Sequence, residues 1–380
     1  MSCERSDGIK RLGLIVNPVA GMGGSVGLKG TDGKDILQEA IALGASPRAP
    51  LRAAEALEEL SLRKDGIEIF VFSGDMGASE SASAGFRTVL LGAGSEGRLT
   101  SADDTVMAAR LMEEAGVELI LFAGGDGTAR DMVMAVGTRV PVVGIPAGVK
   151  IHSPVFARNP AGAGKLADLF LFGSPMGLEE LEVMDIDEEA FRGGIVRTSL
   201  YGYLRVPFER RHLQGGKSGG GKSEAVELDG VVREAASRMT PGVLYLVGPG
   251  STTAALMRRL GCEHTLLGVD AIRDGRTTGK DLSEKEILKI VEPGNTRLIV
   301  TVIGGQGFIL GRGNQQISPE VVRLAGKENI MIISTPSKLR SLIGKSLFVD
   351  TGDTLLDMEL CGYIRVITGL GEETIFRVER

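Results

Sequence analysis

Short apolar runs alternate with segments of helical spacing over the first 150 residues. The apolar runs have the length and the β-branched content of strands that are buried on both faces. Between them, apolar residues recur at the three- and four-residue spacing of amphipathic helices, and Ser101 followed by Asp104 forms a capping box for one of these. The alternation predicts a doubly wound α/β domain, whose parallel sheet binds ligands beyond the carboxyl ends of its strands. The expected strands are residues 12–16, 67–72, 88–91, 117–123 and 140–145.

After about residue 155 the pattern changes to β-branched and aromatic segments separated by glycines, at residues 195–208, 296–303 and 331–334. This change predicts a second, β-rich domain. We therefore expect an α/β nucleotide-binding domain over residues 1–155 and a β-rich domain over 156–345. Strands over 346–380 could return to the first domain.

Length and composition support this division. A chain of 380 residues is long enough for two cores, and 43% hydrophobic with 24% charged residues is typical of globular proteins. The net charge of −6 predicts no attraction to nucleic acid or to an anionic membrane surface, so an anionic ligand has to be held locally. Three scattered cysteines indicate neither a disulfide framework nor a zinc site, and no apolar stretch is long enough to cross a bilayer. We expect a cytoplasmic protein that binds small molecules, with no nucleic-acid or membrane partner.

Two glycine motifs match nucleotide-binding patterns but lack the context. Residues 216–223 satisfy the phosphate-loop pattern GxxxxGK[ST], but residues 209–214 intervene after the preceding strand. Gly92, Gly94 and Gly97 form GxGxxG, but the helix cap at Ser101 comes too late for a dinucleotide turn. A solvated loop explains the first motif better than a phosphate loop does, and a simple glycine-rich turn explains the second.

The segment VELILFAGGDGTARDM predicts a buried strand, a tight turn and the start of a helix. Gly124, Gly125 and Gly127 let the backbone approach a ligand, and the amides that open the helix favour phosphate. Asp126 is then placed to receive the proton of an acceptor hydroxyl during phosphoryl transfer. A helix N-cap aspartate explains the same residue equally well.

The GGDGT turn after a central strand resembles the signature of the NAD kinase and diacylglycerol kinase superfamily. Two more segments agree in order: Asn17 to Gly21 resembles its NPxxG turn, and GPGSTTA, with Ser251, Thr252 and Thr253, resembles the TPTGSTAY segment of NAD kinases. Over nearly its whole length the chain is similar to the archaeal and bacterial branch of predicted ATP- or polyphosphate-dependent NAD kinases.

The resemblance implies phosphoryl transfer from ATP or polyphosphate, with Mg²⁺, to the 2′-hydroxyl of the adenosine ribose of NAD, in a cleft between the domains. Asp126 would be the general base. The resemblance also implies a homo-oligomer. Phosphates and nucleotide would be bound by Asn17, Gly21, Gly124, Gly125, Gly127 and Thr128, and NAD by Ser251, Thr252 and Thr253.

The chain departs from this family at one place. NAD kinases carry an Asn-Glu pair that contacts ribose and base, and residues 199–204 in its place contain neither residue type. Arg130 and Asp131, directly after GGDGT, could replace the pair, although an acid in the first helical turn also stabilises a helix. Lys150 and His152 follow the next strand and could offer charge to phosphates, or be a surface lysine and a packed histidine. A lipid kinase and a nucleotide-binding regulator without catalysis remain alternatives.

Overall fold

The computed structural model describes residues 8–28, 34–92, 100–148, 151–173, 175–186, 198–208, 222–342 and 346–380. The chain divides into two compact units. The first unit comprises Met1–Met22 and Ser46–Gln214, and the second comprises Gly23–Ala45 and Gly215–Arg380. The first domain expected from the sequence ended at residue 155, whereas the first unit extends to Gln214.

Parallel strands form the sheet of the first unit, as predicted. Within the described residues the sheet has five strands in the order β3-β2-β1-β4-β5, and every neighbouring pair is parallel. All five strands expected from the sequence are confirmed to within a few residues. Their bounds are β1 (Lys10–Val16), β2 (Ile67–Phe72), β3 (Arg87–Gly92), β4 (Leu119–Gly124) and β5 (Val142–Pro146).

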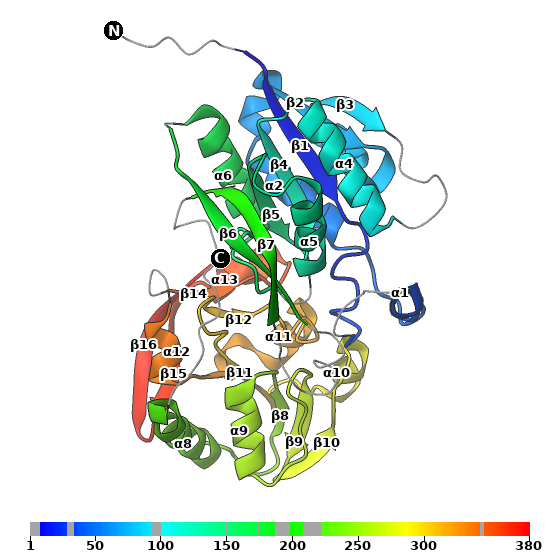
Figure 1. Ribbon diagram of the computed structural model, residues 1–380. Helices are drawn as coiled ribbons and strands as arrows, with labels where there is room; N and C mark the ends of the chain where they lie inside the picture. The colour runs from blue at the N-terminus through cyan, green and yellow to red at the C-terminus, as the bar shows by residue number, and fades with distance from the viewer. Residues whose placement is uncertain are drawn as a thin grey trace. The chain divides into compact units, whose positions relative to one another are not determined.

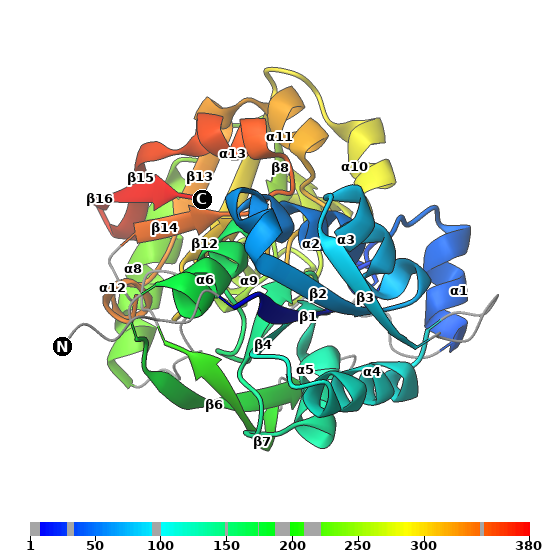
Figure 2. The same cartoon turned by 90° about the horizontal axis from the view of Figure 1, so that it is seen from above.

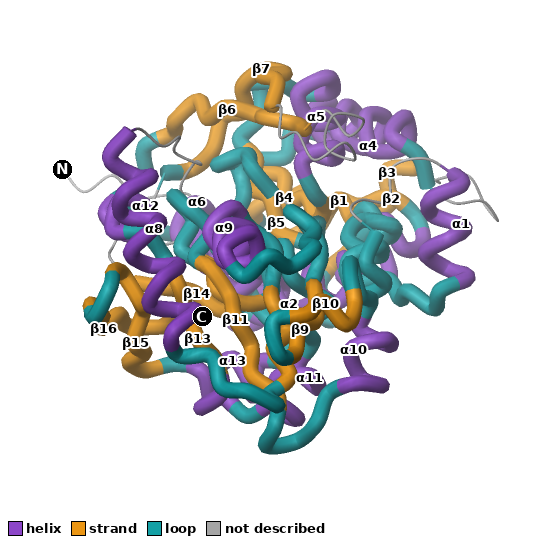
Figure 3. Tube along the Cα trace, turned by 90° about the horizontal axis from the view of Figure 1, so that it is seen from below, coloured by secondary structure: helices purple, strands orange, loops and turns teal. Residues whose placement is uncertain are grey.

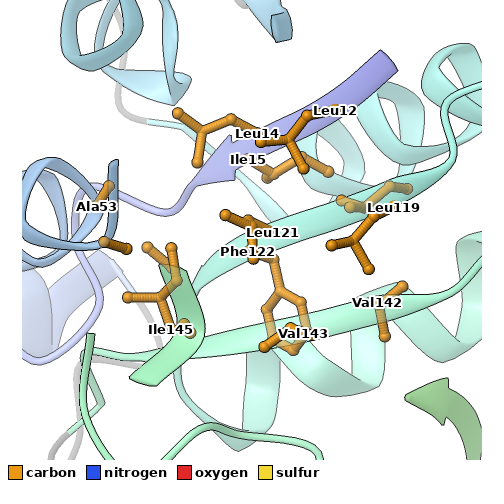
Figure 4. Close-up of a cluster of buried hydrophobic side chains, with 14 of the residues drawn as sticks. Leu12, Leu14, Ile15, Ala53, Leu119, Leu121, Phe122, Val142, Val143 and Ile145 are labelled. Carbon is orange, nitrogen blue, oxygen red and sulfur yellow. The ribbon is translucent and has the colours of Figure 1, made fainter. Parts of the chain in front are cut away.

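The central strands are apolar because both faces of the sheet are covered. Leu12, Leu14 and Ile15 of β1 and Leu121 and Phe122 of β4 are fully buried (Figure 4). The expectation that every strand is buried on both faces is wrong for β3, where Leu90 is 59% exposed. β3 is an edge strand with only β2 beside it, so its outer part meets solvent.

Helices cover the two faces of this sheet in pairs. α2 (Ala49–Glu58) and α6 (Pro160–Phe172) pack together against one face, and α4 (Ala102–Glu114) and α5 (Asp126–Ala135) against the other (Figure 2). The predicted capping box opens α4, since the Ser101 amide and hydroxyl both donate to Asp104 Oδ2 at 2.8 Å. Along the chain, η1 (Ser61–Gly66) precedes β2, and η2 (Gly74–Met76) and α3 (Ala78–Ser83) follow it.

An antiparallel hairpin completes the first unit. It consists of β6 (Leu178–Ile186) and β7 (Thr198–Pro207), and it packs on α5. The strand expected at 195–208 is therefore confirmed over β7, while residues 195–197 lie outside the described part.

The second unit is built on a larger mixed sheet (Figure 1). Its described strands have the order β10-β9-β8-β11-β13-β15-β16-β14-β12, and β8, β11, β13 and β15 run parallel. β14 and β16, from the last 35 residues, pair within this sheet, although the sequence analysis left open their return to the first domain. The bounds are β8 (Leu244–Val247), β9 (Asp270–Arg273), β10 (Arg276–Gly279), β11 (Thr296–Thr301), β12 (Phe308–Leu310), β13 (Ile330–Ile333), β14 (Ser346–Val349), β15 (Gly362–Gly369) and β16 (Glu372–Glu379).

Alternate residues of these strands enter two separate cores. Leu244 and Leu246 pack into one apolar cluster, whereas Tyr245 and Val247 pack into the other. The sheet is therefore covered on both faces, by α8 and α9 on one and by α10 and α11 on the other (Figure 3). The helices are α8 (Lys222–Ser237), α9 (Ser251–Arg259), α10 (Glu284–Ile290), α11 (Pro319–Ala325), α12 (Pro336–Arg340) and α13 (Thr354–Leu360).

The segment Gly23–Ala45 belongs to the second unit, although it lies in the chain between β1 and β2 of the first sheet. The Ser25 carbonyl accepts the Glu284 amide at 3.1 Å, and the Leu43 carbonyl accepts from Lys285 Nζ at 2.6 Å. The segment contains α1 (Lys34–Ala42). These bonds tie Ser25 and Leu43 to the beginning of α10.

Candidate functional site

Three loops meet at the carboxyl edge of the first sheet, after β1, β4 and β5. The Asn17 amide donates to the Ala123 carbonyl at 3.0 Å. The Ala147 and Gly148 amides both donate to the Gly124 carbonyl, at 2.9 and 3.0 Å. Gly21 has a φ of +77°, and a Cβ there would lie 1.8 Å from the Ala147 carbonyl oxygen. The loops are thus packed backbone against backbone, which explains a glycine at the end of the NPxxG turn.

The GGDGT turn lies between β4 and α5, as expected. Gly125 is the N-cap of α5 and Asp126 is its first residue, so the alternative interpretation of Asp126 as the N-cap is wrong. Gly125 is tightly packed, because Gly148 Cα would lie 3.2 Å from a Cβ at that position. Gly127 and Thr128 follow in the first turn of α5, where helix amides offer hydrogen bonds to an anion.

The Asp126 carboxylate is held by the loop after β5. Oδ1 accepts from the Ser153 amide at 3.1 Å and from Ser153 Oγ at 2.6 Å. Oδ2 accepts from the His152 amide at 2.7 Å and lies 3.2 Å from His152 Nδ1. The side chain of Asp126 is only 6% exposed. These contacts fix the carboxylate at the start of the helix and leave it little freedom to rotate.

Ser153 extends this network to the β6–β7 hairpin. Its Oγ accepts from the Met184 amide of β6 at 3.0 Å, and its one hydrogen can be donated to Asp126 Oδ1 at 2.6 Å or to the Met184 carbonyl at 2.9 Å. Ser153 was not predicted from the sequence, although its position directly after His152 in GVKIHS could have indicated it. Of the two charged candidates in that segment, Lys150 lies outside the described residues, and His152 is buried beside Asp126.

The NPxxG and GGDGT motifs are joined by one side-chain bond. Asn17 Nδ2 donates to Thr128 Oγ1 at 3.0 Å, and Thr128 is buried. Asn17 Oδ1 in turn accepts the Val19 amide at 3.3 Å, which closes the turn after β1. The structure therefore brings Asn17, Thr128 and Asp126 to one sheet edge.

Arg130 and Asp131 continue α5 away from this edge. The Arg130 guanidinium lies over the ring of Tyr201, 5.5 Å from its centre, and Asp131 is buried. Tyr201 belongs to β7, the strand that occupies the place of the missing Asn-Glu pair. The aromatic ring of Tyr201 therefore helps to position the Arg130 guanidinium.

Another buried acid lies beyond the carboxyl end of β2. Glu80 in α3 is 7% exposed, and its Oε2 has no hydrogen-bond partner among the described residues. Burial raises the pKa of Glu80 above its ordinary value, and the nearby charge of Asp75 acts in the same direction. The sequence pattern did not indicate this acid, because only the fold removes it from water.

In the second unit, Ser251, Thr252 and Thr253 open α9 at the carboxyl end of β8. Gly250 precedes them with a φ of +136° and donates its amide to the Leu266 carbonyl at 3.0 Å. Thr252 and Thr253 are buried and Ser251 is exposed. Lys338, which the sequence analysis missed, donates to Thr252 Oγ1 at 2.8 Å and to Ser251 Oγ at 3.1 Å.

The two discounted glycine motifs are only partly described. Residues 215–221 and 93–99 lie outside the described part, while α4 begins at Ala102 as the cap predicted. In the ranges that the structure covers, no group of three or more His, Cys, Asp or Glu residues could hold a metal ion. Nor does any helix within those ranges have the length and apolar character that a membrane span requires.

The comparison with known families matches both units. The ATP-NAD kinase N-terminal domain matches residues 12–174, and the ATP-NAD kinase C-terminal domain matches residues 241–378. Together these two matches span most of the chain. The chain belongs to the ATP-NAD kinase family.

Comparison with individual proteins adds little to this family assignment. A stretch of 71 residues is 41% identical to acetoin catabolism protein X of Cupriavidus necator, and it spans 19% of this chain and 19% of that protein. No solved structure matches the chain.

Proposed function

We propose that the protein transfers the γ-phosphoryl group of magnesium-bound ATP to the 2′-hydroxyl of the adenosine ribose of NAD. The bond between the γ-phosphorus and the β,γ-bridging oxygen breaks, and a bond from the 2′-oxygen to phosphorus forms. Asp126 takes the hydroxyl proton, and ADP and NADP leave. The observation that carries this proposal is the buried Asp126 carboxylate, fixed at the carboxyl edge of the sheet in the domain that matches the kinase family.

The contacts of Asp126 suggest how it acts. A carboxylate has about four lone-pair sites, and Ser153 and His152 together direct four polar atoms at them. The contact with His152 Nδ1 is the longest, at 3.2 Å. We infer that the substrate hydroxyl takes this position while the two backbone amides keep the carboxylate oriented.

The remaining roles follow the family resemblance. Gly124, Gly125, Gly127 and Thr128 would bind phosphates at the N-terminus of α5, with Asn17 and Gly21 beside the nucleotide. Ser251, Thr252 and Thr253, with Arg130 and Asp131, would contact NAD. Magnesium would be bound mainly by the phosphates, since this ion keeps most of its water ligands. An active site between the domains, a cytoplasmic location and a homo-oligomer remain predictions.

The test is NADP formation from NAD with ATP and Mg²⁺, and in parallel with polyphosphate as donor. Asp126→Asn is compared with Ser153→Ala, which removes a contact of the carboxylate but not the carboxylate, and with Asp103→Asn at an exposed site on α4. We expect kcat of Asp126→Asn to fall roughly 10²- to 10⁴-fold per folded molecule, with NAD still bound. Asp103→Asn should match the parent.

Retained turnover in Asp126→Asn would overturn the assignment of the base. If neither donor gave NADP although NAD bound, the proposed acceptor would be wrong.

A further inference from the structure

Three neighbouring parallel strands of the second unit end at one edge of its sheet. β8 leads to Ser251 and Thr252, β11 ends at Thr301, and β13 leads to Lys338 in α12. Parallel strands that end side by side place the residues that follow them at the same edge. All of these residues belong to the second unit, so their geometry is internal to it.

Lys338 is held firmly at this edge. The backbone of α12 is capped by Thr335, and the Ser337 amide donates to Glu227 Oε2 of α8 at 2.9 Å. The aliphatic stem of Lys338 passes Gly304, where an added Cβ would lie 3.7 Å from its Cγ. The ammonium group therefore reaches the Ser251 and Thr252 hydroxyls from a fixed base.

The N-terminus of α9 adds further donors. The N-cap residue of this helix is Gly250, which has no side chain that could accept from the helix amides, and the first amides of a helix have no partner inside it. Each hydroxyl that accepts from Lys338 Nζ can direct its own hydrogen elsewhere, and accepting from a cation makes it a stronger donor. Ser251 is exposed, so its hydroxyl is accessible to a ligand.

Thr301 provides an independent indication of a ligand. Its side chain lies against the N-cap of α9, since a Cβ on Gly250 would be 2.5 Å from Thr301 Cγ2. Thr301 is 8% exposed, and its Oγ1 has no hydrogen-bond partner among the described residues. A buried hydroxyl without a partner is costly, which favours an acceptor that arrives with a substrate.

We propose that Lys338 and the Ser251 and Thr252 hydroxyls, with the first amides of α9, bind phosphate oxygens of a substrate. In a protein of net charge −6, such a local cluster is what attracts an anion to this edge. The inference rests on the proposed function in one respect: we assign the anion to the pyrophosphate of NAD. Inorganic polyphosphate, as donor, presents the same chemistry, and the test separates the two.

The experiment compares Lys338→Met, which keeps the stem that passes Gly304, with Lys338→Arg, which keeps the charge. Lys289→Met, an exposed lysine on α10, is the matched control. Calorimetric titration of the full chain uses NAD, ADP-ribose and adenosine as probes. Lys338→Met should raise the Kd of NAD and ADP-ribose roughly tenfold or more and leave adenosine unchanged, because only the first two carry a pyrophosphate. Lys338→Arg should restore much of the affinity.

These titrations require no turnover, so they remain decisive if the chain makes no NADP. Equal weakening of adenosine and ADP-ribose, or no weakening of either, overturns the anion site. A raised KM for polyphosphate with an unchanged Kd for NAD overturns the assignment to the acceptor. If Lys338→Met unfolds, Ser251→Ala tests the same site and should weaken ADP-ribose in the same way.

Discussion

Replacing Asp126 by asparagine should destabilise the ligand-free protein, whatever it does to catalysis. Both carboxylate oxygens accept a backbone amide, one from His152 and one from Ser153. Asparagine has only one oxygen, so its amide nitrogen must face one of these N–H groups. The buried backbone donor then loses its acceptor and meets another donor in its place.

The size of the effect follows from the bond that is lost. A hydrogen bond to a charged acceptor contributes about 1.5–3 kcal/mol, and an unsatisfied buried donor costs a similar amount. For a unit of this size, each kcal/mol lowers Tm by about 2–4 °C. We therefore expect Asp126→Asn to unfold roughly 3–12 °C below the parent.

The assay is thermal unfolding of the ligand-free protein by circular dichroism, repeated in urea. Ser153→Ala is the matched variant, because it removes the hydroxyl bond to Asp126 and leaves both backbone bonds to the carboxylate. It should itself cost about 1.5–3 kcal/mol, because the lost bond also goes to the charged carboxylate, and it leaves the Met184 amide without this acceptor. An Asp126→Asn protein that melts with the parent would refute this reasoning, and any loss of turnover could then be attributed to chemistry alone.

Two further predictions concern the same edge of the first sheet. Because burial raises the pKa of Glu80, its stabilising contribution is complete below the unfolded-state pKa and is lost as the pH rises through the folded pKa. Glu80→Gln should therefore raise Tm at pH 8 and have little effect at pH 4, and an equal shift at both pH values would contradict the burial argument. Gly21→Ala should cost several kcal/mol, since its Cβ would overlap the Ala147 carbonyl at 1.8 Å, whereas Gly74→Ala, with a φ of +65° and no atom within 4 Å, should cost about 1 kcal/mol in urea unfolding. Similar costs for the two variants would show that backbone strain, and not the overlap, dominates at Gly21.

Strand positions and the GGDGT turn could be predicted from the sequence because both depend on local pattern. A strand buried on both faces appears as a continuous apolar run, and the strand-turn-helix order places Asp126 at a sheet edge. The exposure of β3 was not predictable in the same way, since an edge position depends on strand order. Burial of Glu80 likewise arises from packing that no local spacing records.

Contacts between residues far apart in the chain were the main features that the sequence could not predict. Lys338 follows β13, a threonine and a proline, which indicates a helix start but not which hydroxyls the lysine will reach. Its partners lie 86 and 87 residues earlier in the chain. Ser153 was missed for a related reason: the sequence places it after a strand, and only the structure shows that its hydroxyl joins Asp126 to β6.

The excursion of residues 23–45 into the second unit has a consequence for synthesis. Leu43 and Lys285, which hydrogen bond in the folded chain, are 242 residues apart. During translation, α1 therefore leaves the ribosome long before α10 exists, while the strands of the first sheet are made on both sides of it. A first unit that folds during synthesis would do so before this segment has its docking partner. The second unit cannot complete its structure until both its early and its late parts are present, so its folding waits for the C-terminal half of the chain.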